Sequence, residues 1–393
     1  MTQRTIVLAA GGTGGHIFPA EALTEELVKR GHKVFMVTDK RFADYSAASL
    51  KGILGDVPIF YIRAGTLGHS ITKRAAGGYN IVAGVLQARK LLGKVKPDVV
   101  VGFGGYPSFP TMIAALSRRL PTIIHEQNAL LGRANRVLAS RVTKIAASFE
   151  NTGFIKNEDK AKITMVGNPV RSAIRALHEV PAPELKEDGI MQILILGGSQ
   201  GASVFGDIMP KAVALLPDVL KKRLRIDQQV RAHQLEATRD AYENMGVHVT
   251  LDTFFADVPA RLAGSHLVIS RAGASTVAEI TCAGRPAILV PYPEAADNHQ
   301  KINASAMEDA GGAWLMPQEA FTPEALAARL ESFLTLPASL SKAAKAAHSL
   351  GRPGATGALA DLVLAEAARR QGENYSASQS MHMPGGLQRD IAA

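Results

Sequence analysis

The chain has 393 residues, of which 47% are hydrophobic and 20% charged, and it carries a net charge of +9. This composition excludes a disordered chain, and the length predicts two domains of about 150–200 residues each. The single cysteine, Cys282, excludes an intramolecular disulfide and a cysteine metal cage, which suits a reducing cytoplasm. The positive charge favours anionic partners, but aromatic residues are only 5%, so we expect no nucleic-acid partner.

The first forty residues predict a β-α-β unit. Ile6–Ala10 is an apolar strand, residues 17–30 have helical spacing, and Lys33–Thr38 is a second strand. The glycine-rich stretch 11–16, GGTGGH, joins the first strand to the helix. A dinucleotide fingerprint fails because Ile17 stands where its third glycine belongs. A tight turn would need fewer glycines, so we expect backbone N–H groups to approach an anion at the helix N-terminus.

Similar strands follow at Ile59–Arg63, Val99–Phe103 and Thr122–His125. The uncharged stretch 99–117 is nearly long enough to span a bilayer, but its glycines and prolines predict a strand, a turn and a short helix, so we predict no transmembrane segment. The strand at 122 ends in His-Glu-Gln-Asn (125–128), where doubly wound sheets bind ligands.

The pattern restarts after a linker at 178–189. Met191–Leu196 is a strand followed by GGSQGA (197–202), and further strands are predicted at 247–251, 267–269 and 287–290. The predicted fold class is therefore α/β, with two doubly wound parallel sheets facing a central cleft. We expect domains at 1–170 and 171–370, a last helix at about 355–370 that packs back on the first domain, and a disordered tail at 371–393.

Three polar motifs in the second half each allow two interpretations. Thr276 and Glu279 form a capping box or place a carboxylate for ribose hydroxyls, and spacing favours the cap. The run 297–300, Asp-Asn-His-Gln, suits sugar hydroxyls or the first turn of a capped helix equally well. Arg171 in GNPVR is a phosphate partner or a surface arginine. The sequence contains no D-x-D and no His/Glu cluster with metal spacing, which disfavours a metal-dependent reaction.

Seven motifs together resemble the MurG family, the N-acetylglucosaminyltransferases of peptidoglycan synthesis. They are GGTGGHIFPA, GFGGYPSFP, HEQN, GNPVR, GGSQGA, SRAGASTVAEI and DNHQKINA, and the resemblance covers about residues 3–365. It implies a two-domain GT-B fold and inverting transfer of N-acetylglucosamine from UDP to C4 of the muramoyl sugar of lipid I, giving lipid II. It implies no cofactor and no active-site metal.

The resemblance also assigns residues. The donor and cleft residues would be Thr13, Gly14, Gly15, Asn128, Arg171, Ser199, Phe255, Ala274, Ser275, Thr276, Glu279, His299 and Gln300. The acceptor residues would be Gly104, Gly105, Tyr106, His125 and Gln127.

Inverting transfer needs a base for the acceptor hydroxyl. We favour His16, which follows the glycine loop directly and has a pKa suited to neutral pH. Glu126 is the second catalytic candidate, and His125 is a further alternative for the base.

Residues 63–96 suit an anionic membrane surface, because basic and apolar side chains are interleaved there. The set is Arg63, Lys73, Arg74, Arg89, Lys90, Lys94 and Lys96 with Ile71, Tyr79, Ile81, Val82, Val85 and Leu86. A core-facing helix with solvated lysines explains the segment nearly as well. We expect a peripheral protein on the cytoplasmic face of the bacterial inner membrane. A UDP-N-acetylglucosamine 2-epimerase and a non-enzymatic nucleotide-sugar-binding adaptor are the competing functions.

Overall fold

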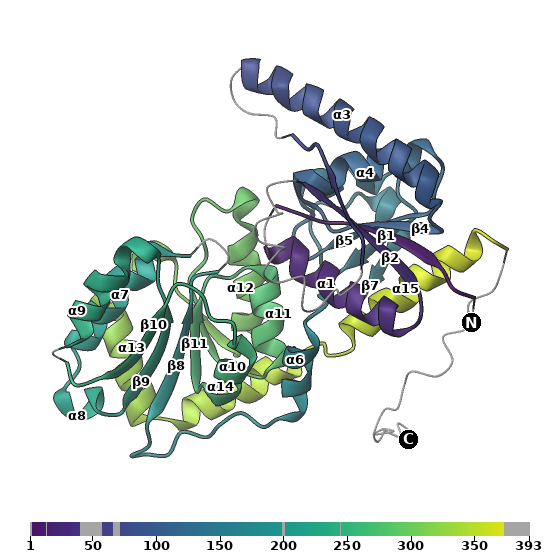
Figure 1. Ribbon diagram of the computed structural model, residues 1–393. Helices are drawn as coiled ribbons and strands as arrows, with labels where there is room; N and C mark the ends of the chain where they lie inside the picture. The colour runs from purple at the N-terminus through teal and green to yellow at the C-terminus, as the bar shows by residue number, and fades with distance from the viewer. Residues whose placement is uncertain are drawn as a thin grey trace, which may run out of the picture.

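The computed structural model describes residues 2–12, 14–39, 57–65, 71–198, 201–243 and 245–372. Each half of the chain holds one parallel β-sheet with helices packed against it, and the two halves lie side by side (Figure 1). The predicted fold class, two doubly wound parallel sheets, is therefore confirmed.

The first sheet has the strand order β3-β2-β1-β4-β5-β6-β7, and all its pairs are parallel. Its strands are β1 (Thr5–Ala9), β2 (Lys33–Asp39), β3 (Ile59–Ile62), β4 (Val99–Gly102), β5 (Thr122–Glu126), β6 (Lys144–Ala147) and β7 (Ile163–Met165). Its helices are α1 (Gly14–Lys29), α3 (Ile71–Val95), α4 (Gly105–Ser117), α5 (Arg133–Ala139) and α15 (Ala355–Arg369). In β1, residues 6–9 are fully buried, because helices cover both faces of a parallel sheet.

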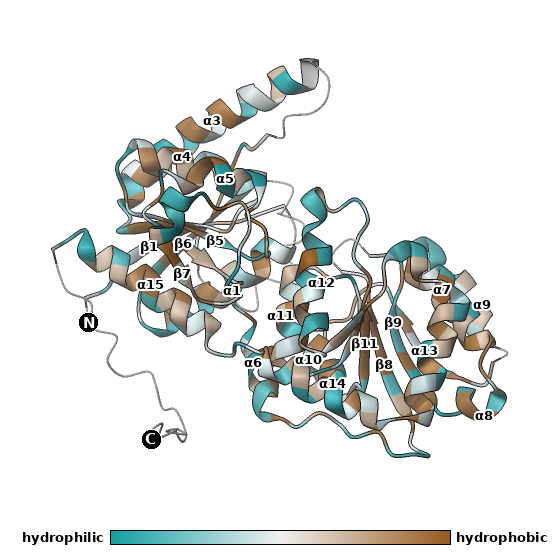
Figure 2. Cartoon of the chain, turned by 180° about the vertical axis from the view of Figure 1, so that it is seen from behind, coloured by the Kyte–Doolittle hydropathy of each residue, from teal (hydrophilic) through white to brown (hydrophobic). Residues whose placement is uncertain are grey.

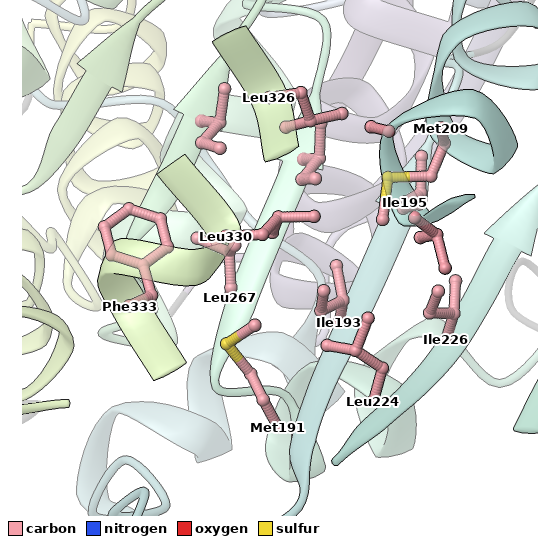
Figure 3. Packing of buried hydrophobic residues seen from close by; sticks show 14 of the residues in the cluster. Met191, Ile193, Ile195, Met209, Leu224, Ile226, Leu267, Leu326, Leu330 and Phe333 are labelled. Atoms are coloured by element: carbon pink, nitrogen blue, oxygen red, sulfur yellow. The ribbon is translucent and has the colours of Figure 1, made fainter. Parts of the chain in front are cut away.

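The second sheet has the order β10-β9-β8-β11-β12-β13, again all parallel. Its strands are β8 (Met191–Leu196), β9 (Leu224–Gln229), β10 (His248–Asp252), β11 (Leu267–Ser270), β12 (Ala287–Leu289) and β13 (Ala313–Leu315). Its helices are α6 (Ser172–Arg175), α7 (Ser203–Ala214), α8 (Asp218–Lys221), α9 (Leu235–Glu243), α10 (Val258–Gly264), α11 (Ala274–Cys282), α12 (His299–Asp309), α13 (Pro323–Thr335) and α14 (Ala338–Ser349). In its core, Ile193 and Ile195 share a buried cluster with Leu330 and Phe333 of α13 (Figure 3).

The strand order fixes where ligands can bind. In both sheets the order reverses beside the first strand, between β1 and β4 in one sheet and between β8 and β11 in the other. Doubly wound sheets bind ligands at this reversal, beyond the carboxyl ends of the strands. The predicted glycine loops at 11–16 and 197–202 follow β1 and β8 directly, so each lies at such a point.

The C-terminal helix α15 packs on the first sheet and not on the second. Leu359 and Val363 belong to the same buried cluster as Leu23 and Leu27 of α1, and Figure 1 shows α15 beside α1. The chain therefore passes twice between its two halves. The division at 170 and 171 falls between β7 and β8 and stays a proposal, and residues 373–393 of the predicted tail lie outside the described residues.

Four strands, β6, β7, β9 and β13, lie outside the predicted set. β7 and β13 have only three residues each, too few for a periodic pattern. β9 reads LRIDQQ, in which the alternation of apolar and polar residues covers only four positions before two consecutive glutamines. The other predicted strands are present, and each of their ends lies within one residue of the predicted position.

Because Leu359 is fully buried against α1, replacing it by alanine should destabilise the first domain although it lies near the C-terminus. We expect Leu359→Ala to lower the free energy of unfolding by about 2–5 kcal/mol, measured in denaturant. Leu336→Ala removes a side chain that is 65% exposed, and it should cost no more than about 0.5 kcal/mol. Equal losses in the two variants would contradict the packing role of α15.

Candidate functional site

A cleft of about 2020 Å³ separates the two domains. Its first wall includes the loops that follow β1, β4 and β5. Its second wall includes the loops that follow β8, β9, β10, β11 and β12 and the start of α12. Sites for one small ligand occupy about 300–1,000 Å³. The cleft therefore has room for two ligands at once, one against each wall.

Most of the predicted functional residues line this cleft. They are Gly14, Gly15, His16, Gly104, Gly105, Tyr106, Glu126, Gln127, Asn128, Arg171, Phe255, Ala274, Ser275, Thr276, Glu279, His299 and Gln300. Thr13 and Ser199 lie outside the described residues. Residues far apart in the sequence thus converge, because the carboxyl ends of both sheets face one another.

His16 lies in the first turn of α1, against the loop that follows β4. Gly104 and Gly105 have φ values of +80° and +70°, and a Cβ on Gly105 would lie 3.3 Å from the imidazole ring. These glycines adopt the left-handed conformation and leave room for the ring. Burial and, to a smaller extent, the charge of His299 lower the pKa of His16 to about 4, while a hydrogen bond to the backbone of Gly11 acts to raise it. The expectation of a pKa near neutral pH for this histidine is therefore wrong. At neutral pH the ring is uncharged, as a proton acceptor must be.

Glu126, at the end of β5, is almost fully buried and its carboxylate accepts four hydrogen bonds. Oε1 accepts from the backbone and side-chain nitrogens of Asn128, both at 3.1 Å, and Oε2 accepts from Gly132 N at 2.8 Å and Asn135 Nδ2 at 2.9 Å. Burial raises the pKa of Glu126, and these hydrogen bonds oppose the rise. Because four donors fill its lone pairs, we interpret Glu126 as a positioning residue that shapes the loop before α5.

His125 does not line the cleft, in contrast to its predicted acceptor role. Its side chain is fully buried, its Nδ1 accepts from Gln127 Nε2 at 2.9 Å, and its Nε2 lies 3.1 Å from the Gly167 carbonyl. Burial lowers its pKa to about 4, which keeps the ring neutral. Since β-strand side chains alternate between faces, His125 points away from the cleft when Glu126 points toward it. We interpret it as a structural residue, and not as the base.

The capping box predicted for Thr276 and Glu279 is wrong. The helix α11 begins at Ala274 after the N-cap Gly273, and no side chain caps it. Its first turn, residues 274–276, therefore presents its N–H groups to the cleft, where the helix dipole favours an anion. Ser275 Oγ donates across the cleft to the Gly15 carbonyl at 3.1 Å, so the two walls touch here.

Arg171 and Glu279, predicted to bind different parts of one ligand, are paired with each other. Arg171 Nε and Nη2 both donate to Glu279 Oε1, at 2.9 and 2.8 Å, and the guanidinium lies 4.9 Å from the centre of the Phe18 ring. Burial raises the pKa of Glu279, and Arg171 opposes the rise. The guanidinium thus fixes the carboxylate at the cleft wall, in an orientation that two ligand hydroxyls can share.

A second carboxylate, Glu21 on α1, stands beside this pair. It is 2% exposed and one of its oxygens has no hydrogen-bond partner. Burial and, to a smaller extent, the charge of Glu279 raise the pKa of Glu21 to about 7, while the charge of Arg171 acts to lower it. One guanidinium thus compensates two buried carboxyl groups, which explains why one of them keeps its proton more readily.

The start of α12 carries the run 297–300. Asp297 and Asn298 have φ values of 54° and 55°, and Asn298 makes no side-chain cap. The capped-helix interpretation is therefore not supported. Gln300 Oε1 accepts from Tyr292 N at 2.9 Å, which orients its amide group at the cleft wall. Asp297 forms a 2.5 Å ion pair with Arg136 of α5, from the other domain.

Two residues that bear on the site are absent from the sequence prediction. Arg271 lines the second wall, where its guanidinium donates to the carbonyls of Val290 and Pro291 and to Gln318. Its place directly after β11 was the available signal. Asn303 is fully buried on α12 and contacts the first domain, and no sequence pattern distinguishes it from a core polar residue.

Among the residues that the structure describes, no group of three or more His, Cys, Asp or Glu side chains is placed to hold a metal ion. In the same part of the chain, no helix combines the length and hydropathy of a membrane span.

Two protein-family models match this chain, one in each half. The model of the glycosyltransferase family 28 N-terminal domain matches residues 6–147, and that of the family 28 C-terminal domain matches residues 192–356. A UDP-N-acetylglucosamine--N-acetylmuramyl-(pentapeptide) pyrophosphoryl-undecaprenol N-acetylglucosamine transferase from Rhodospirillum centenum is 53% identical over 96% of this chain and 99% of its own length.

Two solved structures are similar over nearly the whole chain. MurG of Acinetobacter baumannii has a TM-score of 0.73 and 29% identity, covering 92% of this chain and 99% of that chain. A UDP-GlcNAc 2-epimerase from Neisseria meningitidis has a TM-score of 0.61 and 16% identity, covering 92% of this chain and 100% of that chain. The second likeness shows the fold alone.

Two Rossmann-like domains that face one another across a ligand cleft define the GT-B class of glycosyltransferases. Within that class, the chain belongs to the family of UDP-N-acetylglucosamine--N-acetylmuramyl-(pentapeptide) pyrophosphoryl-undecaprenol N-acetylglucosamine transferases.

The environment of Glu21 predicts a pH-dependent stability. Because its folded pKa of about 7 exceeds its ordinary value of 4.5, the native state binds a proton that the unfolded state releases, and this group makes stability fall as pH rises from 4.5 to 7. Glu21→Gln should therefore be more stable than the wild type at pH 8, by about 3 kcal/mol at most, and similar to it near pH 4.5. Urea unfolding at both pH values measures this.

Glu25→Gln, on the same helix but outside this cluster, is the matched control. A stability difference between Glu21→Gln and the wild type that does not change with pH would contradict the assignment.

Proposed function

We propose that this chain transfers N-acetylglucosamine from UDP-N-acetylglucosamine to the C4 hydroxyl of the muramoyl sugar in lipid I, giving lipid II. The observation that supports the proposal most strongly is that one cleft has two walls with different chemistry. The second wall offers a helix N-terminus and a paired carboxylate, which suit the phosphates and the ribose of a nucleotide. The first wall offers a neutral histidine in a glycine-lined recess, which suits an attacking hydroxyl.

In this mechanism His16 accepts the proton of the C4 hydroxyl as that oxygen attacks the anomeric carbon from the face opposite UDP. Attack on the opposite face inverts the anomeric centre. A neutral imidazole that lines the cleft can take the proton directly. Gly104 and Gly105 fix the ring, and Tyr106 lines the same recess.

The departing UDP needs compensation of its negative charge. The N–H groups at 274–276 and the positive end of the α11 dipole supply part of it, and these donors are in place before the reaction. Arg171 contributes a full positive charge within the same wall while it orients Glu279 toward the ribose hydroxyls. Gln300 and His299 line the cleft beside them and would recognise the sugar hydroxyls.

One assay separates this function from its competitors. The full-length protein is incubated with labelled UDP-N-acetylglucosamine and a lipid I analogue, and the products are resolved. Transfer of label to the lipid supports the proposal. Free N-acetylmannosamine would indicate the epimerase reaction, and binding without turnover would indicate an adaptor, so either result would overturn it.

Replacing His16 tests its role as the base. We expect His16→Ala to lower kcat by about 10²–10⁴-fold, because that is the usual contribution of a positioned general base. Steady-state kinetics with the lipid I analogue measures it, and His248→Ala, which removes an exposed histidine of β10, is the control. Near-normal turnover of His16→Ala with an unchanged pH profile would exclude His16 as the base.

The acceptor is lipid-anchored, so we further propose that α3 contacts the cytoplasmic face of the inner membrane. Tyr79, Val82 and Leu86 are 66%, 61% and 62% exposed, and their spacing places them on one side of the helix. The opposite side is buried, and a Cβ on Gly84 would collide with the Arg63 carbonyl. Figure 2 shows hydrophobic segments along α3, which projects from the first domain.

The basic residues Arg89, Lys90 and Lys94 are exposed on the same helix and suit anionic headgroups. Two residues of the predicted membrane surface face elsewhere. Ile81 lines the cleft, and Val85 packs against the core of the first domain. The side chains of Ile71 and Lys73 lie outside the described residues.

Sedimentation with vesicles tests the membrane contact. The wild type should bind phosphatidylglycerol vesicles more tightly than phosphatidylcholine vesicles, because each basic residue near the surface contributes about 1 kcal/mol. The double variant Val82→Asp with Leu86→Asp should bind both less, whereas Leu215→Asp, at an exposed apolar side chain of the other domain, should bind like the wild type. Equal partitioning of the wild type to both vesicles would overturn the electrostatic part.

A further inference from the structure

The side chain of Asn303 joins the two walls of the cleft from behind. Its Oδ1 accepts from the Ala129 backbone N–H at 2.9 Å, and its Nδ2 donates to Asn128 Oδ1 at 3.1 Å and to the Ala272 carbonyl at 3.2 Å. Asn303 is fully buried, with 0% of its surface accessible to solvent. One acceptor and both amide protons are thus used inside the protein.

These three partners belong to the parts of each wall that we assign to the reaction. Ala272 directly precedes the N-cap of α11, the helix whose N-terminus faces the donor phosphates. Asn128 and Ala129 belong to the loop that Glu126 holds through its four hydrogen bonds. Asn303 therefore links the phosphate-binding turn of one domain to the polar loop of the other through a single amide.

We infer that Asn303 is a positioning residue that holds the first wall in register with the second, so that a donor bound on α11 meets His16 at a fixed separation. The inference rests on the proposed function. Asn303 does not line the cleft, so it acts through Asn128 and Ala129 and not by touching substrate. Correct alignment of reacting groups is worth several orders of magnitude in rate, and a displacement of about 1 Å can cost 10²-fold.

Other contacts also join the two walls. The Arg136–Asp297 pair is 30% exposed on both sides, so water and salt screen it. The bond from Ser275 to Gly15 joins the first turn of α11 to the glycine loop, so it does not hold the loop at Asn128 and Ala129. Without the Asn303 amide, the buried Ala129 N–H and Ala272 carbonyl would lose their partner, and separating the walls to admit water is the least costly way to satisfy them.

The test compares Asn303→Ala with the wild type in three measurements on the full chain. We expect kcat with UDP-N-acetylglucosamine and a lipid I analogue to fall by about tenfold or more. The Kd for UDP, measured by calorimetry, should stay within about threefold, because Asn303 makes no hydrogen bond to the Arg171–Glu279 pair or to the N–H groups at 274–276. Hydrogen exchange at the Ala129 amide should accelerate by about tenfold or more.

Two further variants complete the design. Asn303→Asp keeps an acceptor for Ala129 but loses both Nδ2 donors, so its kcat should fall as well, and it replaces Asn303→Ala if that variant does not fold. Asp309→Ala, at an exposed position of the same helix, should match the wild type in all three measurements.

Wild-type kcat in Asn303→Asp or Asn303→Ala would overturn the inference. So would a loss of UDP binding that parallels the loss of kcat, since Asn303 would then support the donor site alone. The exchange measurement needs no turnover. If the wild type transfers no sugar, the proposed function fails, while faster exchange at Ala129 still tests the link between the walls.

Discussion

Parallel strand pairing is the constraint on which the rest of this structure depends. In a doubly wound sheet every strand runs the same way, so every loop that follows a strand emerges at one edge. The glycine loop after β1, the turn after β4 and the polar end of β5 therefore share one edge. The same holds for the loops after β8 and β11. Because these two edges face each other, loops from both domains line one cleft.

Burial of charge explains much of the site's chemistry. Burial shifts His16, Glu21 and Glu279 toward their neutral forms, and the two carboxyl groups are the more deeply buried of the three. Arg171 opposes that shift for both carboxyl groups. The Arg171–Glu279 ion pair keeps both charges compensated at the cleft wall.

Sequence patterns predicted the repeated sheet and most of the cleft, because both follow from local rules. Apolar runs mark buried parallel strands, and glycine loops mark the points where the strand order reverses. Contacts between residues that are distant in the sequence could not be predicted from these patterns. The burial of His125, the pairing of Arg171 with Glu279 and the bonds of Asn303 all depend on how separate elements pack. The capping box failed for a smaller reason, since helix α11 begins at Ala274, two residues before Thr276.

The double passage of the chain between its halves has a mechanical consequence. The outgoing segment at Gly167 and the returning one at Ala355 are in contact, since a Cβ on Gly167 would lie 3.0 Å from Ala355 Cβ, and Thr356 Oγ1 donates to the Val170 carbonyl. The two domains are therefore joined by two covalent connections that lie next to each other. A second connection beside the first restricts sliding and twisting of one domain against the other more than a single connection would.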